Sequence, residues 1–202
     1  MANGDCFDVD ERYMTQETGN RKKIYHRKRD VNTFAYLCGA NKTIFEGIDE
    51  KRAGWIDYCL VSLVLSAFTF EAFLNHLGSR IVPDWQSVDR KPMKEKLKLI
   101  AKHLGVQVKH RTDPWRTVTQ LQKFRDQIAH GRSESLNDEV IRAGETKIYE
   151  DKPETEWEKF CTEEKARRCF DCVLEAMRVL NVAAGFDEYP ETDFGLMRRW
   201  SE

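Results

Sequence analysis

The stretch RAGWIDYCLVSLVLSAFTFEAFLNHLGSRI, residues 52–81, is long and strongly apolar. Its apolar side chains fall on almost every face of a helix, and the first proline after them is Pro83. A helix that is apolar on all sides is buried by its own domain, by a second subunit or by both. We therefore expect one long buried helix that ends before Pro83.

Three further segments carry the periodicity of amphipathic helices, over residues 89–104, 113–130 and 162–184. Gly105 and Gly185 follow the first and the last of them. Glycine is common just after a helix because it adopts positive φ without strain. These positions are the expected helix ends.

The start of the helix over 113–130 is also marked, because Asp113 is a suitable N-cap and Pro114 suits the first helical position. Residues 31–48 have a looser helical rhythm that Gly39 and Gly47 interrupt. For that segment we expect one helix or a pair of helices.

Helical segments dominate and alternating strands are nearly absent, which predicts an all-α fold, an up-and-down bundle of roughly four to five helices. Residues 132–160 form a polar connection before the last helix. We expect a small irregular or hairpin insertion there, with a short helix over 136–143 and paired segments around 147–149 and 157–160.

The 202 residues are 41% hydrophobic and carry a formal net charge of −1, which suits one globular domain without bulk affinity for nucleic acid. Residues 1–30 are polar and include a basic cluster, so we expect a flexible or peripheral arm. Residues 31–202 are expected to form the single helical domain.

Targeting features are not apparent. No run of about 18 or more uninterrupted apolar residues occurs, so no membrane span is expected. The first residues lack the basic and apolar regions of a secretory signal. The expected location is the cytoplasm.

Six cysteines are present, and their spacing does not favour a disulfide framework. Cys169 and Cys172 have the spacing of half a zinc site, but a second ligand pair is missing. We expect structural thiols and neither a metal nor another cofactor.

The residues best suited to catalysis lie in the segment Arg125-Asp126-Gln127-Ile128-Ala129-His130. Arginine is suited to phosphate, and histidine transfers protons near neutral pH. Arg125 and His130 lie about 140° apart around a helix, so they share a site only if the helix ends between them or if two copies meet across a two-fold axis. Asp126 and His130, four residues apart, share a face.

This segment resembles the motif of the HEPN superfamily, in which an arginine and a polar residue precede a histidine late in a helical bundle. Phe70-Glu71-Ala72-Phe73-Leu74-Asn75 is similar to the long helix upstream in many members. The resemblance covers roughly residues 55–185. It implies a HEPN-like fold and a metal-independent endoribonuclease that acts as a homodimer, often as a toxin or defence effector with an antitoxin or regulatory protein.

The resemblance also implies residue roles. His130 would transfer the proton and Arg125 would stabilise the phosphoryl group. Asp126 stands at a position that is often Asn in the family, where an acid either neutralises Arg125 or orients His130. In a ribonuclease of this kind, the basic runs of the chain itself would steer RNA. They are the lysine-rich segment with Lys91, Lys94, Lys98 and Lys102, and as a further basic surface the arm over residues 21–29.

Other interpretations stay open. Glu71 and Asn75 share a helix face, and they either belong to a buried polar network or line the site opposite Arg125. The motif residues would also serve a module that binds RNA or a nucleotide without cleaving it. A third interpretation is a protein-interaction bundle that binds its partner through residues 55–77, and basic runs are also common on solvated helix faces.

Overall fold

The computed structural model describes residues 25–50, 53–137 and 153–201, which are mostly helical. These residues form six α-helices, two short 3-10 helices and one two-stranded sheet. The predicted all-α class is therefore confirmed. The described chain divides into a helical unit, Val31–Gly195, and a small unit that contains both strands.

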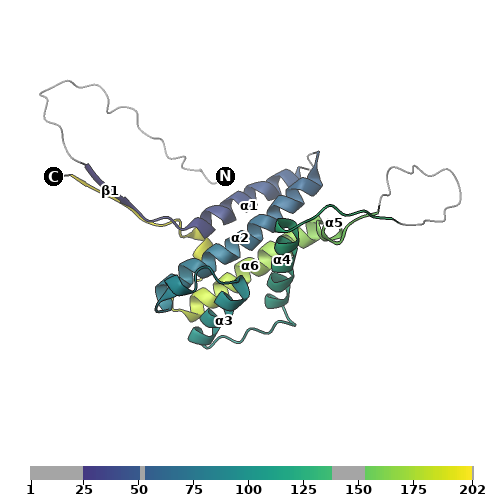
Figure 1. The fold of residues 1–202 in the computed structure, drawn as a ribbon. Helices are drawn as coiled ribbons and strands as arrows, with labels where there is room; N and C mark the ends of the chain where they lie inside the picture. The colour runs from purple at the N-terminus through teal and green to yellow at the C-terminus, as the bar shows by residue number, and fades with distance from the viewer. Residues whose placement is uncertain (1–24, 51–52, 138–152, 202) are drawn as a thin grey trace, which may run out of the picture. The chain divides into compact units, whose positions relative to one another are not determined.

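Helix α2, Trp55–Ile81, is the centre of the helical unit and ends before Pro83, as predicted. It lies between α1 and α6 and also packs against α3 and α4 (Figure 1). Its fully buried side chains include Leu63, Phe70, Phe73, Leu74 and Leu77. The expectation of burial on every face is not met within one chain, because Trp55, Val61 and Phe68 are 51%, 42% and 44% exposed.

Helix α2 is also long and apolar enough to cross a membrane when judged by length and composition alone. The core helices of proteins without membrane spans satisfy the same two measures. The position of α2 among four packed helices accounts for its composition equally well.

Helix α1, Thr33–Asp49, is one continuous helix, so the alternative of a helix pair is wrong. Gly47 has a packing role. A Cβ atom at this position would lie 2.9 Å from the Tyr58 ring, so glycine lets α1 and α2 approach closely. Gly39 lies in the helix with nothing near its missing side chain.

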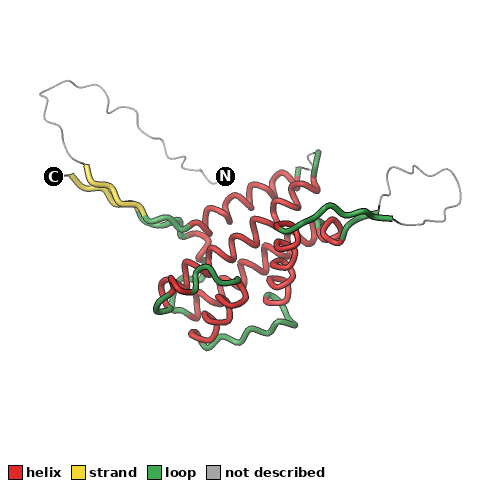
Figure 2. The backbone as a smooth tube through the Cα atoms, in the orientation of Figure 1, coloured by secondary structure: helices red, strands yellow, loops and turns green. Residues whose placement is uncertain are grey.

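Helix α3, Met93–Leu104, begins later than predicted, because Trp85–Ser87 form the 3-10 helix η2 and Pro92 stands at the N-cap. Gly105 ends α3 with φ of 69°, as predicted. A loop without helix or strand then leads to α4 (Figure 2).

Helix α4 spans Trp115–Ala129, and its start corrects the prediction. Pro114 occupies the N-cap position, so it is not the first helical residue. The Asp113 carboxylate accepts hydrogen bonds from the Thr117 and Arg116 side chains, and no side-chain cap forms among the described residues at this helix start.

The predicted hairpin before the last helix is wrong for residues 157–160, which belong to helix α5, Glu156–Phe160. A capping box causes this: Thr155 accepts from the Glu158 backbone, and the Glu158 carboxylate accepts from Thr155 N. Leu136 is not helical, while residues 138–143 and 147–149 lie outside the described residues.

Helix α6, Glu163–Ala183, closes the helical unit. The Thr162 hydroxyl caps it by accepting from Lys165 N, and Gly185 follows with φ of 79°. The 3-10 helix η3, Pro190–Thr192, packs against α1 and α6. The predicted end of α6, just before Gly185, is confirmed.

The small unit contains strands β1, Tyr25–Arg29, and β2, Met197–Ser201, paired antiparallel with Arg27 opposite Arg199. Neither strand was expected, because β1 falls in the predicted arm and β2 in the predicted helical domain. Pairing between the two ends of a sequence leaves little local pattern. The rest of the arm, residues 1–24, lies outside the described residues.

Candidate functional site

The Arg125–His130 segment occupies the last turn and the C-terminal end of α4. Arg125 is still helical, whereas His130 is the C-cap with φ of −114° and ψ of 16°. The helix therefore ends between the two side chains. This is the condition under which they can share a site within one chain.

Both side chains line a cavity of about 590 Å³ between α2, α3 and α4. Five lysine and arginine residues line it against two carboxylates, so its wall is positively charged. The cations are Arg90, Lys91, Lys94, Lys123 and Arg125, the carboxylates are Glu71 and Asp126, and His110 and His130 complete the ionisable set. His130 is exposed.

Arg125 is held by two carboxylates. Its Nη2 atom lies 2.6 Å from Glu71 Oε2, and its Nη1 atom lies 2.9 Å from Asp126 Oδ1. The guanidinium also lies over the Phe68 ring, with 5.7 Å between Cζ and the ring centroid. The side chain is 22% exposed, so Arg125 is fixed in place and still reaches the cavity.

Asp126 engages Arg125 rather than His130. Its Oδ1 atom accepts from Arg125 and from Gln122 Nε2, the latter at 2.9 Å. Within the described part of the chain, no hydrogen bond joins the Asp126 carboxylate to the His130 ring; the two residues are linked by the backbone bond from His130 N to Asp126 O. Of its two expected roles, the geometry favours partial neutralisation of Arg125.

Lys96 belongs to the same group of charges, and the sequence reasoning did not select it. Its side chain is only 2% exposed, and its Nζ atom lies 3.1 Å from Glu71 Oε1. A signal was present, since Lys96 lies at helical spacing from Met93 and Ile100 and so falls on the inward stripe of α3. An inward lysine needs an acidic partner, and that partner is Glu71.

The four predicted RNA-binding lysines do not all line the cavity. Lys91 and Lys94 line the cavity, but Lys98 and Lys102 are not among its lining residues. The cavity lies at the start of α3, and each helical turn moves a side chain about 5.4 Å further along the axis. The loop and α4 instead supply four residues that the sequence did not suggest, His110, Thr119, Gln122 and Lys123.

Asn75 does not reach this site, although Glu71 one turn earlier does. The Asn75 Oδ1 atom is buried and accepts no hydrogen bond from the described residues. Asn75 is therefore neither a cavity residue nor a member of the Glu71 ion-pair group.

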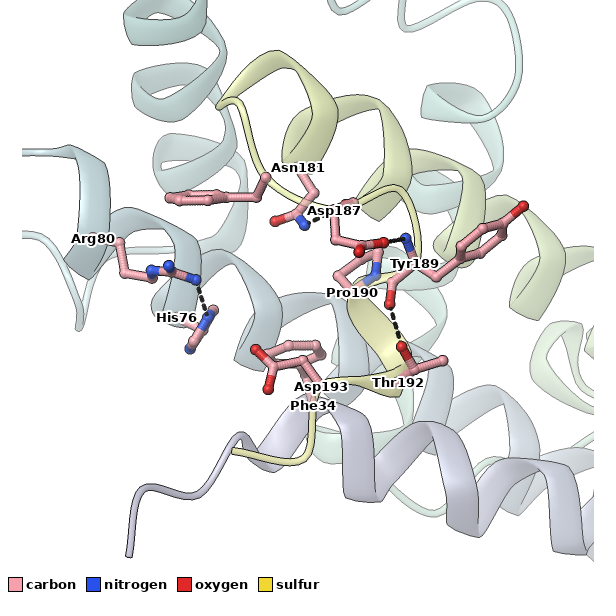
Figure 3. A pocket seen from close by; sticks show the side chains of 10 residues that line it. Phe34, His76, Arg80, Asn181, Asp187, Tyr189, Pro190, Thr192 and Asp193 are labelled. Carbon is pink, nitrogen blue, oxygen red and sulfur yellow. Dashed lines mark hydrogen bonds between the residues drawn. The ribbon is translucent and has the colours of Figure 1, made fainter. Parts of the chain in front are cut away.

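A second cavity of about 330 Å³ is formed by α1, α2 and the segment after α6 (Figure 3). His76 and Arg80 project from α2, with 3.4 Å between His76 Nε2 and Arg80 Nη1. Burial and the Arg80 charge lower the pKa of His76, opposed by Asp193. This cavity contains no residue of the Arg125–His130 segment.

The described cysteines are free thiols. Burial raises the pKa values of Cys38, Cys161 and Cys169 to about 12, which keeps these thiols protonated and unreactive at neutral pH. Cys172 is half-buried. Within residues 25–50, 53–137 and 153–201, no three His, Cys, Asp or Glu side chains are grouped as metal ligands.

Comparison of the chain with protein-family models, with curated proteins and with solved structures gives no significant match.

Proposed function

We propose that this chain is a HEPN-like helical-bundle domain that binds RNA in the α2–α3–α4 cavity and cleaves it without a metal ion. One observation carries the proposal: Arg125 and His130 line the same positively charged cavity. The combination joins a phosphate ligand, a proton-transfer group and a basic wall that attracts a polyanion.

The proposed reaction uses the RNA 2′-hydroxyl as nucleophile. His130 removes its proton, the 2′-oxygen attacks the adjacent phosphorus, and the bond from phosphorus to the 5′-oxygen breaks. The leaving 5′-oxygen takes up a proton, and the products are a 2′,3′-cyclic phosphate and a 5′-hydroxyl. Arg125 stabilises the charge that develops on the non-bridging oxygens.

The active form is proposed to be a homodimer, in which His130 of a second copy protonates the leaving oxygen. Two features support this. Trp55, Val61 and Phe68 leave apolar surface exposed along α2. Phe68 also contacts Arg125, so a copy that covers this surface reaches the site. The proposed setting is a cytoplasmic toxin or defence effector controlled by an antitoxin or regulatory protein.

The test is cleavage of single-stranded RNA by the purified chain in the presence of a metal chelator. We expect products ending in 2′,3′-cyclic phosphate, and we expect His130→Ala and Arg125→Ala each to lower the rate by about 100-fold or more. His103→Ala is the matched control, because His103 is exposed on α3 outside the cavity. Equal activity of the wild type and both site variants would refute the catalytic roles.

A non-cleaving RNA- or nucleotide-binding module is the second candidate function, and a specific observation favours it. Glu71 and Asp126 both form ion pairs with Arg125, so the cation that should meet the phosphate is partly neutralised. Tight RNA binding with no cleavage product would establish this alternative. Absence of both binding and cleavage would exclude both functions.

A further inference from the structure

We infer that Lys96 is a positioning residue that keeps Arg125 available to phosphate by neutralising Glu71 from the interior. This inference rests on the proposed function and deepens it. Lys96 does not bind RNA itself, because its side chain is 2% exposed and is not among the residues that line the cavity.

The two oxygens of Glu71 serve two different cations. Oε1 lies 3.1 Å from Lys96 Nζ, and Oε2 lies 2.6 Å from Arg125 Nη2. The carboxylate thus separates a buried ammonium from a guanidinium that reaches the cavity. Any change in the charge at Lys96 alters how strongly Glu71 holds Arg125.

Removal of Lys96 would change the net charge of this group of side chains. Two cations, Lys96 and Arg125, face two carboxylates, Glu71 and Asp126, so the group is neutral overall. Without Lys96 the same group carries one net negative charge directly beside the position of the phosphate. Partly buried charges are weakly screened, so that change opposes binding of an anion.

Stability alone does not account for a lysine at this position. The neighbouring inward residues of α3, Met93, Leu97 and Ile100, are apolar and buried. Replacing a buried ion pair by apolar groups is often neutral or stabilising. The ion pair between Lys96 and Glu71 is therefore better explained by its effect on the charge of the site than by a contribution to the packing of α2 against α3.

The test measures the binding of RNA that carries 2′-O-methyl groups, which the proposed reaction cannot cleave. We expect Lys96→Met to weaken binding roughly tenfold, Glu71→Gln to tighten it, and the double variant to return close to the wild-type affinity. Lys42→Met is the matched control, because Lys42 is exposed on α1 and does not line the cavity. If Lys96→Met and Glu71→Gln both weaken binding, the pair has a structural role and the inference is wrong.

Salt dependence provides a second readout. A lysine that contacts phosphate contributes about one unit to the slope of log K against log salt concentration. Lys94→Met is therefore expected to make the slope shallower, whereas Lys96→Met leaves the slope unchanged. A shallower slope for Lys96→Met would mean that Lys96 contacts RNA directly, which would contradict the inference.

A measurement without RNA separates this inference from the proposed function. Phenylglyoxal modifies guanidinium groups, and the modification of Arg125 can be followed by peptide mass spectrometry with Arg178 as an internal reference. We expect slower modification of Arg125 in Lys96→Met and faster modification in Glu71→Gln. Unchanged rates in both variants would overturn the inference, whereas failure of the wild type to bind RNA would count against the proposed function alone.

Discussion

Asp126 Oδ1 lies 2.9 Å from Arg125 Nη1, so the residue that follows the cation in sequence also neutralises it in space. We predict that Asp126→Asn raises RNA affinity several-fold, because one negative charge leaves the cavity while an oxygen remains to accept from Gln122. Asp171→Asn is the control, since Asp171 is exposed on α6 outside the cavity. Fluorescence anisotropy with labelled RNA measures the effect, and an equal gain from the control would show bulk charge to be the cause.

The lysines of α3 should differ in their effects on RNA binding. Lys94 lines the cavity and Lys102 does not. We predict that Lys94→Ala weakens RNA binding by roughly 1 kcal/mol or more and lowers the salt slope, while Lys102→Ala has a much smaller effect. Equal losses in titrations at several salt concentrations would indicate that RNA follows the whole exposed face of α3.

Gly78 is predicted to tolerate no side chain. A Cβ atom there would lie 2.3 Å from Trp85 Cη2, inside the contact between α2 and η2. Gly78→Ala should lower the free energy of unfolding by about 1–3 kcal/mol through overpacking. Gly39→Ala is the matched control in α1, where a methyl group meets nothing within 4 Å, and it should stabilise by about 0.5–1 kcal/mol. Urea denaturation compares the two, and similar changes would contradict the packing argument.

His76 should make stability depend on pH. Burial, chiefly, lowers its pKa in the folded chain, so as pH falls below about 6.5 the unfolded chain takes up a proton before the folded chain does. The contribution of His76 to stability is therefore present above that pH and is lost as pH falls through the lowered pKa. We predict a smaller loss of unfolding free energy between pH 8 and pH 5 in His76→Gln than in the wild type. His103→Gln, at an exposed position, should retain the wild-type loss in the same urea titrations.

Local sequence patterns were sufficient to predict the helices in much of the helical unit. The periodicity of residues 52–81 and of α6 placed these helices within a few residues, because inward side chains recur every turn. Gly105 marked the end of α3 for a reason that is equally local, its positive φ. Helix α5 was not predicted, although Thr155 and Glu158 form a capping box, because its five residues are too few to show helical periodicity.

Only part of the candidate site could be predicted from the sequence. The sequence indicated Arg125, His130 and the acid between them, since their chemistry is visible in the residue types. It did not show which lysines face them, because Lys94 and Lys102 have the same charge and a similar helical setting. Their difference arises from the position of the cavity along α3.

The sequence by itself determined that the chain is helical, where its main helices end, and that a guanidinium and an imidazole lie at the end of one of them. Only the tertiary structure decided that Glu71 lies between Lys96 and Arg125, and that residues 25–29 pair with 197–201. The physical reason is the range of the interactions. Helix periodicity and caps depend on residues a few positions apart, whereas an ion pair between Glu71 and Arg125 spans 54 positions and exists only after α2 and α4 have packed.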